Sequence, residues 1–169
     1  MKDWIENWKR NAARMEDETY NFLTRLKQYR DSDRIDRIAG EVHREVFSQI
    51  DCTDCGHCCR TVRPEVDQTD IARIAAFLGI SAPEFTEKYL RSGDRDELEM
   101  KSLPCPFLVG NECSIYDVRP ALCREYPHTD KPEFTTRRFT HIANTQVCPA
   151  VYHIIQKLKN RIGRHERRP

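Results

Sequence analysis

The segment Cys52-Thr53-Asp54-Cys55-Gly56-His57-Cys58-Cys59 holds four of the eight cysteines of the chain. Thiolates bind soft and borderline metal ions, and gaps of two residues let successive sulfur atoms curl around one centre. Gly56 permits the sharp backbone turn that such wrapping requires. The first three cysteines match the start of a bacterial ferredoxin run, which continues with three residues, Cys and Pro, whereas here Cys59 follows at once. The match is partial, so further ligands must come from elsewhere.

Later segments of the chain supply four more cysteines. Cys148 precedes Pro149 at an expected helix start, where the positive end of the helix favours a thiolate. The side chains of adjacent Cys58 and Cys59 point in different directions in most backbone conformations, which favours two neighbouring centres, or one ligand beside one packed thiol. The expected metal ligands are Cys52, Cys55, Cys58, Cys59, Cys105, Cys113, Cys123 and Cys148. They permit two four-thiolate sites, or one cluster with spare structural thiols.

Whether the cysteines bind metal or form disulfides depends on the cellular compartment of the protein. The first ten residues, Met1 to Arg10, contain no apolar run and no cleavage site of the secretory type, so we expect a cytoplasmic protein. Thiols stay reduced there, which favours metal ligands. The alternative is a disulfide framework, because the number of cysteines is even. No stretch approaches the roughly 18 apolar residues of a spanning helix, so no membrane partner is expected.

The charge balance argues against nucleic acid. The chain of 169 residues has 28 Lys and Arg against 27 Asp and Glu, a net charge of +1. From Lys157 onward there is a local excess of basic residues, but cations at a helix C-terminus are favoured by the helix dipole. This tail contains no aromatic residue for stacking on bases, so we interpret it as a solvated end and consider nucleic-acid binding unfavoured.

Residues 1–51 contain no cysteine and no proline and are expected to form an N-terminal helical extension. Apolar side chains recur there at multiples of three and four, which predicts one long amphipathic helix followed by a second that Asp31 caps. The apolar stripe of the first helix consists of Trp4, Trp8, Met15, Phe22, Leu26 and Tyr29. We expect a helical hairpin packed on the rest of the protein. The alternative is a coiled coil that dimerises or binds a protein partner.

Residues 52–169 are expected to form the cysteine-cluster metal-binding domain with a C-terminal helix. The patterns predict a helix over 68–78 that Gly79 ends, a shorter helix from about residue 82 that ends at Ser92-Gly93, and a short strand within 97–103. A brief helix after Pro120 would carry Cys123. Residues 129–147 read as irregular with a short strand near 137–142, and a helix over 149–162 would end at Gly163. The fold class is therefore mainly α, small, irregular and cysteine-rich.

The cysteine blocks carry a resemblance to a known family. The first segment continues with Arg60, and it is followed by Cys105-Pro106-Phe107-Leu108 and by Cys113-x-Ile115-Tyr116-x2-Arg119-Pro120-x2-Cys123-Arg124-x-Tyr126-Pro127. Together they resemble the CxxCxxCC (YkgJ-type) cysteine cluster family over about residues 52–149. The resemblance implies chelation of zinc or iron, and related domains occur in flagellin lysine N-methylases.

Three functions follow as expectations. The first is an iron-binding protein, holding an iron–sulfur cluster or iron, that acts in electron transfer or as an accessory protein. The second is a zinc-stabilised structural or interaction domain without a redox role. The third is a thiol redox enzyme or one associated with methyl transfer. No paired carboxylates and no Ser/His/Asp arrangement can be read from the sequence, so we make no catalytic claim.

Overall fold

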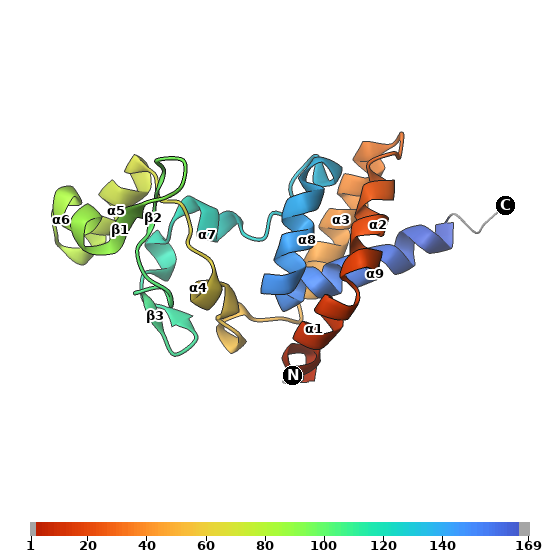
Figure 1. Ribbon diagram of the computed structural model, residues 1–169, viewed down its shortest axis with the longest axis horizontal. Helices are drawn as coiled ribbons and strands as arrows, with labels where there is room; N and C mark the ends of the chain where they lie inside the picture. The colour runs from red at the N-terminus through yellow and green to blue at the C-terminus, as the bar shows by residue number, and fades with distance from the viewer. Residues whose placement is uncertain (1–2, 166–169) are drawn as a thin grey trace. The chain divides into compact units, whose positions relative to one another are not determined.

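The computed structural model describes residues 3–165 and confirms a mainly α fold. The chain divides into two compact units, in which residues 52–126 interrupt the sequence of the other unit, made of residues 1–51 and 127–169. We call these the cysteine-rich unit and the helical unit (Figure 1). Sequence analysis grouped 52–169 together, whereas the compact units place the C-terminal segment with the N-terminal helices.

The helical unit is built from long helices around an apolar core. Helix α9 packs against α1, α3 and α8, and α2 packs against α8. Val42, Phe134, Val151 and Ile154 lie fully buried in this core. The elements are α1 (Asp3–Arg14), α2 (Glu16–Leu26), α3 (Ser32–Phe47), η3 (Phe134–Arg137), α8 (Arg138–Val147) and α9 (Pro149–His165).

The N-terminal helices correct one expectation and confirm another. The expected single helix is divided at Met15, whose φ of −104° and ψ of 16° depart from helical values. The break has a packing reason, because Trp8 of α1 joins a small cluster with Tyr152, whereas Phe22 of α2 packs in the main core. Asp31 caps α3 as expected, with its carboxylate accepting from the backbone N–H of Arg34 at 2.9 Å.

Helix α8 replaces the irregular segment and short strand expected within residues 129–147, and that expectation was wrong. Its buried residues include His141, Asn144 and Thr145, spaced as one helical face. A search for apolar periodicity misses a buried face that is polar. Helix α9 also continues to His165, past the expected stop at Gly163. One glycine inside a helix costs only about 1 kcal/mol, so it need not end one.

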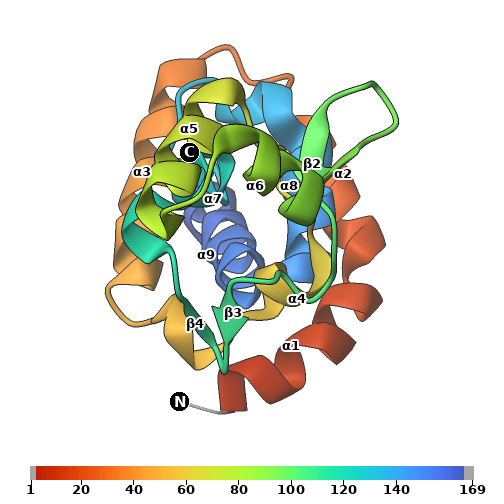
Figure 2. The same cartoon turned by 90° about the vertical axis from the view of Figure 1, so that its left-hand side faces the viewer.

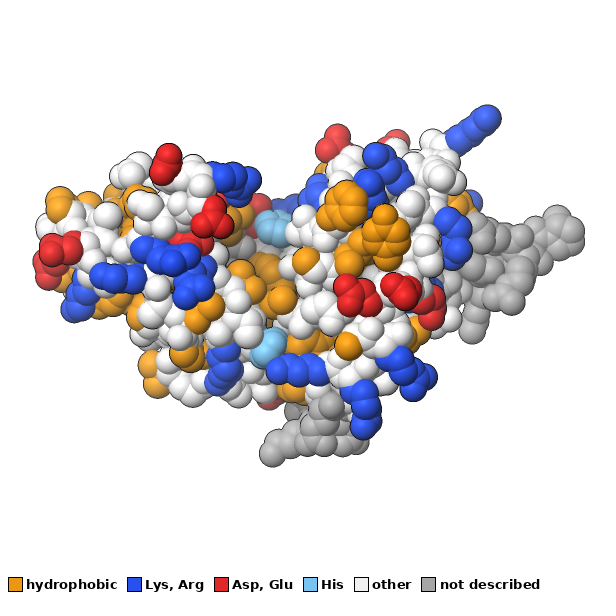
Figure 3. Space-filling model, viewed as in Figure 1, with side chains coloured by type: hydrophobic (Ala, Val, Ile, Leu, Met, Phe, Trp, Pro, Cys, Tyr) orange, Lys and Arg blue, Asp and Glu red, His pale blue; other side chains and the backbone are white. Residues whose placement is uncertain are grey.

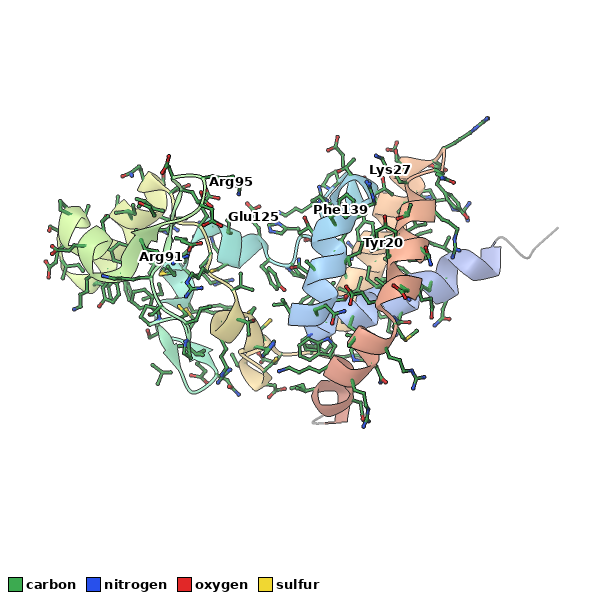
Figure 4. All side chains as sticks on the ribbon, in the orientation of Figure 1. Tyr20, Lys27, Arg91, Arg95, Glu125 and Phe139 are labelled. Carbon is green, nitrogen blue, oxygen red and sulfur yellow. The ribbon has the colours of Figure 1, made fainter. Side chains whose placement is uncertain are left out.

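Two exposed aromatic side chains lie on the paired helices α2 and α8. Tyr20 of α2 is 45% exposed and Phe139 of α8 is 58% exposed (Figures 3 and 4). Binding of a protein partner through the N-terminal helices stays a prediction. Within the described part of the chain, no helix is both long enough and apolar enough to span a bilayer.

The cysteine-rich unit consists of short elements joined by turns. Strands β1 and β2 pair antiparallel, as do β3 and β4, each pair forming a separate two-stranded sheet. The elements are η1 (Cys52–Asp54), α4 (His57–Thr61), α5 (Gln68–Leu78), α6 (Ala82–Tyr89), β1 (Leu90–Ser92), β2 (Leu98–Met100), β3 (Leu108–Val109), β4 (Glu112–Cys113), η2 (Tyr116–Val118) and α7 (Ala121–Glu125). A core around Ile74 and Phe85 supports them.

Local sequence determines several of these elements. Helix α5 has the expected bounds, and Gly79 ends it with a φ of +70°. Ser81 caps α6 by accepting from the backbone N–H of Glu84 at 3.3 Å. The expected helix end at Ser92-Gly93 was wrong, because Leu90–Ser92 pairs with β2 instead. Backbone pairing here prevails over the local tendency to continue the helix.

Candidate metal centre

One cysteine belongs to a different compact unit from the other seven. Cys148 belongs to the helical unit and packs against its core, whereas the remaining cysteines belong to the cysteine-rich unit. All eight lie in the described part of the chain and carry free thiols. The disulfide alternative therefore finds no support in the structure.

The first cysteine segment turns sharply, as its glycine predicts. The carbonyl oxygen of Cys52 accepts from the backbone N–H groups of Cys55 and Gly56, at 3.1 and 3.0 Å. Gly56 has a φ of +56°, which L side chains rarely adopt, and a Cβ atom there would lie 2.6 Å from Nη1 of Arg60 and 3.2 Å from Cα of Asn111. Glycine is needed both for the turn and for the close approach.

Arg60 ties this segment to the hairpin of β3 and β4. Its guanidinium donates to the carbonyl oxygen of Cys55 at 3.0 Å, and to the carbonyl oxygen of Gly110 and Oδ1 of Asn111 at 2.7 Å each. Asn111 in turn donates from Nδ2 to the carbonyl oxygen of Asp54 at 3.3 Å. Helix α4 and the hairpin consequently lie side by side (Figure 2).

Backbone hydrogen bonds bring the segments of Cys59, Cys105 and Cys113 together. The N–H of Cys105 donates to the carbonyl oxygen of Cys59 at 2.7 Å, and the N–H of Leu108 donates to the carbonyl oxygen of Cys105 at 3.0 Å. Leu108 is the strand partner of Cys113. The segment of Cys59 therefore lies beside the hairpin region of Cys105 and Cys113, which is distant from it in the sequence.

Cys123 on α7 joins these three electrostatically. Burial, together with repulsion from nearby Cys59, Cys105 and Cys113, raises the pKa of the Cys123 thiol to about 12, against the lowering effect of the Arg119 charge. Burial and repulsion from Cys59 and Cys113 likewise raise the pKa of Cys105 to about 11. Cys59 thus makes Cys105, Cys113 and Cys123 harder to ionise, so these four cysteines lie near one another, and we call them the four-thiol group.

The adjacent pair Cys58 and Cys59 behaves differently. The two Sγ atoms lie 4.0 Å apart, and the hydrogen bond from Cys58 lowers the pKa of Cys59 to about 7, against the effect of burial. The charge of Arg60 also favours the Cys59 thiolate. Cys59 is therefore the member of the four-thiol group that most readily ionises.

The chemistry of this donor set fits a metal cation. Buried sulfur atoms that repel one another as thiolates become compatible when a cation lies between them, because a coordinating thiol is deprotonated by the metal. Within residues 3–165, no three His, Cys, Asp or Glu side chains are already arranged to hold a metal ion. Binding would require the thiols to turn toward a common point, as occurs where a site forms together with its metal.

Two motif residues, Tyr116 and Arg119, contact each other. Tyr116 is 53% exposed, so it does not shield the thiols from water. Arg119 donates to the carbonyl oxygen of Tyr116 at 2.6 Å and lies 3.7 Å from its ring centroid. Its charge nevertheless lowers the pKa of Cys113 and Cys123, so it opposes the mutual repulsion of the thiols.

The fold and these thiols define a class: a small, mainly α protein with a cysteine-rich chelating domain. Residues 51–149, more than half of the chain, match the model of the CxxCxxCC family, described as "Putative zinc- or iron-chelating domain". The chain belongs to this family, which confirms the resemblance drawn from its motifs.

One relative and the solved structures complete the comparison. The uncharacterized protein MJ0661 of Methanocaldococcus jannaschii is 38% identical to the chain over 82 residues. The alignment covers 46% of this chain and 44% of the relative, so the chain spans less than half of that protein's length. No solved structure matches.

Sequence analysis missed two residues that organise the unit. Asn111 belongs to none of the predicted motifs, although its side chain holds Arg60 and the segment of Asp54. Asp70 was recognised only as part of a helix, although its carboxylate accepts from the backbone of Ala121. Both partners lie about fifty residues away, so no local pattern marks these contacts.

Proposed function

We propose that the protein binds iron through its clustered cysteines, as an iron–sulfur cluster, and acts in electron transfer or as an accessory protein. The observation that carries the proposal is the four-thiol group, in which backbone hydrogen bonds bring the segments of Cys59, Cys105 and Cys113 together and these three cysteines raise the pKa of Cys123. All-sulfur ligation is the usual mode for iron–sulfur clusters.

The remaining cysteines are assigned as follows. Cys52, Cys55 and Cys58 have the ferredoxin-like spacing and form a second ligand set in the proposal. Cys148 lies in the helical unit, and its role as a ligand is the part of the proposal that needs a separate test. A reducing cytoplasm, which we also propose as the location, would keep all these thiols available.

Zinc is the second candidate, and the packing of the four-thiol group against apolar side chains favours it. Structural zinc sites are closed and tetrahedral and often use four thiolates. Cys105 and Cys113 pack against the apolar core of their unit, as expected for such a closed site. In this alternative the metal stabilises the fold and has no redox role.

Anaerobic purification with measurement of iron, zinc and acid-labile sulfide tests the proposal. Iron with a similar amount of sulfide and a brown colour supports the cluster, and zinc without sulfide supports the alternative. A preparation that holds neither metal, and takes up neither on reconstitution, would refute both.

Cysteine variants test the ligand sets. Cys123→Ser and Cys55→Ser are each expected to lower the metal content. Cys148→Ser provides the comparison in the helical unit, since an undiminished metal content would assign this thiol to packing alone. Unchanged metal content in Cys123→Ser would exclude the four-thiol group as a site.

A further inference from the structure

The carboxylate of Asp70 holds the first residue of the helix that carries Cys123. Asp70 lies on α5 and is only 2% exposed. Both of its carboxylate oxygens accept from the backbone N–H of Ala121, at 3.1 Å each. Ala121 begins α7, so Cys123 lies two residues beyond this contact.

Arg73 extends the same contact to the preceding residues. It forms an ion pair with Asp70, and it donates to the carbonyl oxygens of Arg119 at 3.0 Å and Val118 at 3.4 Å. Pro120, between these carbonyls and Ala121, has no N–H to donate. One turn of α5 therefore holds the chain on both sides of Pro120, and we call Asp70 and Arg73 the α5 clamp.

Helix α7 needs such support because it is short. It has only five residues, from Ala121 to Glu125, and an isolated helix of this length is unstable in water. Its end at Glu125 is labelled in Figure 4. The clamp supplies a bifurcated, partly buried hydrogen bond to the N–H of Ala121 at the start of α7. A carboxylate buried to this degree is costly unless it is paired, so its partners are held firmly in turn.

We propose that Asp70 and Arg73 are positioning residues for the metal site, since they fix α7 so that Cys123 is presented to the metal without further ordering of the chain. The inference rests on the proposed metal binding. When the clamp is lost, metal binding must itself order α7, and the cost of that ordering lowers the affinity. Residues that orient ligands in this way typically affect metal affinity by about 10- to 100-fold.

The test uses the full chain, freed of metal under anaerobic conditions, with Zn²⁺ as the probe in competition with a chromophoric chelator. Asp70→Asn keeps the shape of the side chain but removes its charge and its pairing with Arg73. We expect its affinity for Zn²⁺ to fall about tenfold or more. Arg73→Lys, which keeps the charge but loses the planar fork, should show a smaller loss and serves if Asp70→Asn does not fold.

Labelling of individual thiols separates positioning from loss of stability. In the metal-free protein, maleimide should modify Cys123 faster in Asp70→Asn than in the wild type, with the rate at Cys52 unchanged. Ser81→Ala is the matched control, since it removes the cap of α6 in the same unit without touching α7. It should lower the melting temperature but leave Zn²⁺ affinity and Cys123 labelling unchanged.

The outcomes distinguish the two proposals. A wild-type protein that takes up neither Zn²⁺ nor, on reconstitution, iron and sulfide refutes the proposed metal binding, while faster labelling of Cys123 in Asp70→Asn would still support the clamp. If the wild type binds Zn²⁺ and Asp70→Asn binds it equally well, the positioning role is overturned. Equal losses of affinity in Asp70→Asn and Ser81→Ala would overturn it as well.

Discussion

The two units are stabilised by different kinds of interaction. The helical unit buries large apolar side chains between long helices, among them Phe134, Ile154 and Leu158. The cysteine-rich unit has short elements, and side chains such as Arg60 and Asp70 hold its loops by hydrogen bonds to distant backbone groups. Apolar burial stabilises the first without help. In the second, polar contacts set the geometry, and we propose that a metal adds much of the stability.

Metal removal should produce the largest difference in stability between the two units. Binding of a metal to a site that forms with it contributes directly to folding free energy, on the order of 10 kcal/mol for structural zinc. Chelation under anaerobic conditions is expected to lower amide protection in residues 52–126, without abolishing it where the α5 clamp holds α7, while α3 and α9 stay protected. Hydrogen exchange measured by mass spectrometry checks this. A uniform loss of protection in both units would contradict the idea that only the cysteine-rich unit depends on metal.

A cavity in the helical core should have the reverse effect. Ile154→Ala removes a side chain that is fully buried in the helical unit, and such changes cost about 2–5 kcal/mol. We expect a lower melting temperature with no change in metal content. A variant that loses its metal together with its stability would show that the units depend on each other.

Acid should weaken the helical unit through His141. Burial lowers the pKa of His141 to about 4, with a further contribution from the charge of Arg137. The unfolded chain therefore takes up a proton near pH 6.5 while the folded protein does not, so the His141 contribution to stability falls as pH decreases from about 6.5 to 4. The loss is about 3 kcal/mol over this range.

Denaturant unfolding of the wild type and of His141→Leu at several pH values measures this effect. The variant should show a flatter dependence on pH between 4 and 6.5, whatever its stability at neutral pH. Parallel pH profiles for the two proteins would exclude His141 as the source.

The smallest expected effect concerns two glycines with similar backbone angles. Gly56→Ala and Gly110→Ala each place a side chain at positive φ, which costs about 1–2 kcal/mol. At Gly56 the new Cβ also meets Arg60 and Asn111, whereas at Gly110 nothing lies within 4 Å. Gly56→Ala should therefore be the more destabilising of the two by thermal unfolding. Equal losses would mean that Arg60 moves aside without cost.

Sequence alone predicts those parts of the molecule whose causes are local. The helix α5, its stop at Gly79 and the caps at Asp31 and Ser81 each follow from a few neighbouring residues. Helix α8 does not, because the face that it buries carries His141 and other polar residues that find partners only in the folded protein.

For the candidate site, the sequence identifies the sulfur atoms but not their grouping. The motif gives Cys59, Cys105, Cys113 and Cys123 without indicating that they form one group. It also cannot assign Cys148 to the other unit, because that depends on how α9 packs. Long-range packing decides both, and no local spacing encodes it.

The basic excess near the C-terminus also acquires a meaning from the structure. Lys157 pairs with Glu45 at 2.6 Å, and Lys159 pairs with Glu18 at 3.1 Å. Arg161 pairs with Glu45 and with Glu41. These cations of α9 face acidic residues of α2 and α3 rather than solvent alone.

The interruption of one unit by the other has a consequence for synthesis on the ribosome. Domains generally fold as units while the chain emerges from its N-terminus. Helices α8 and α9, which complete the core around α2 and α3, are translated only after all of residues 52–126. The nascent chain thus exposes seven cysteines before the helical unit can close. The cysteine-rich unit would therefore be free to bind the proposed metal while the rest of the protein is still being made.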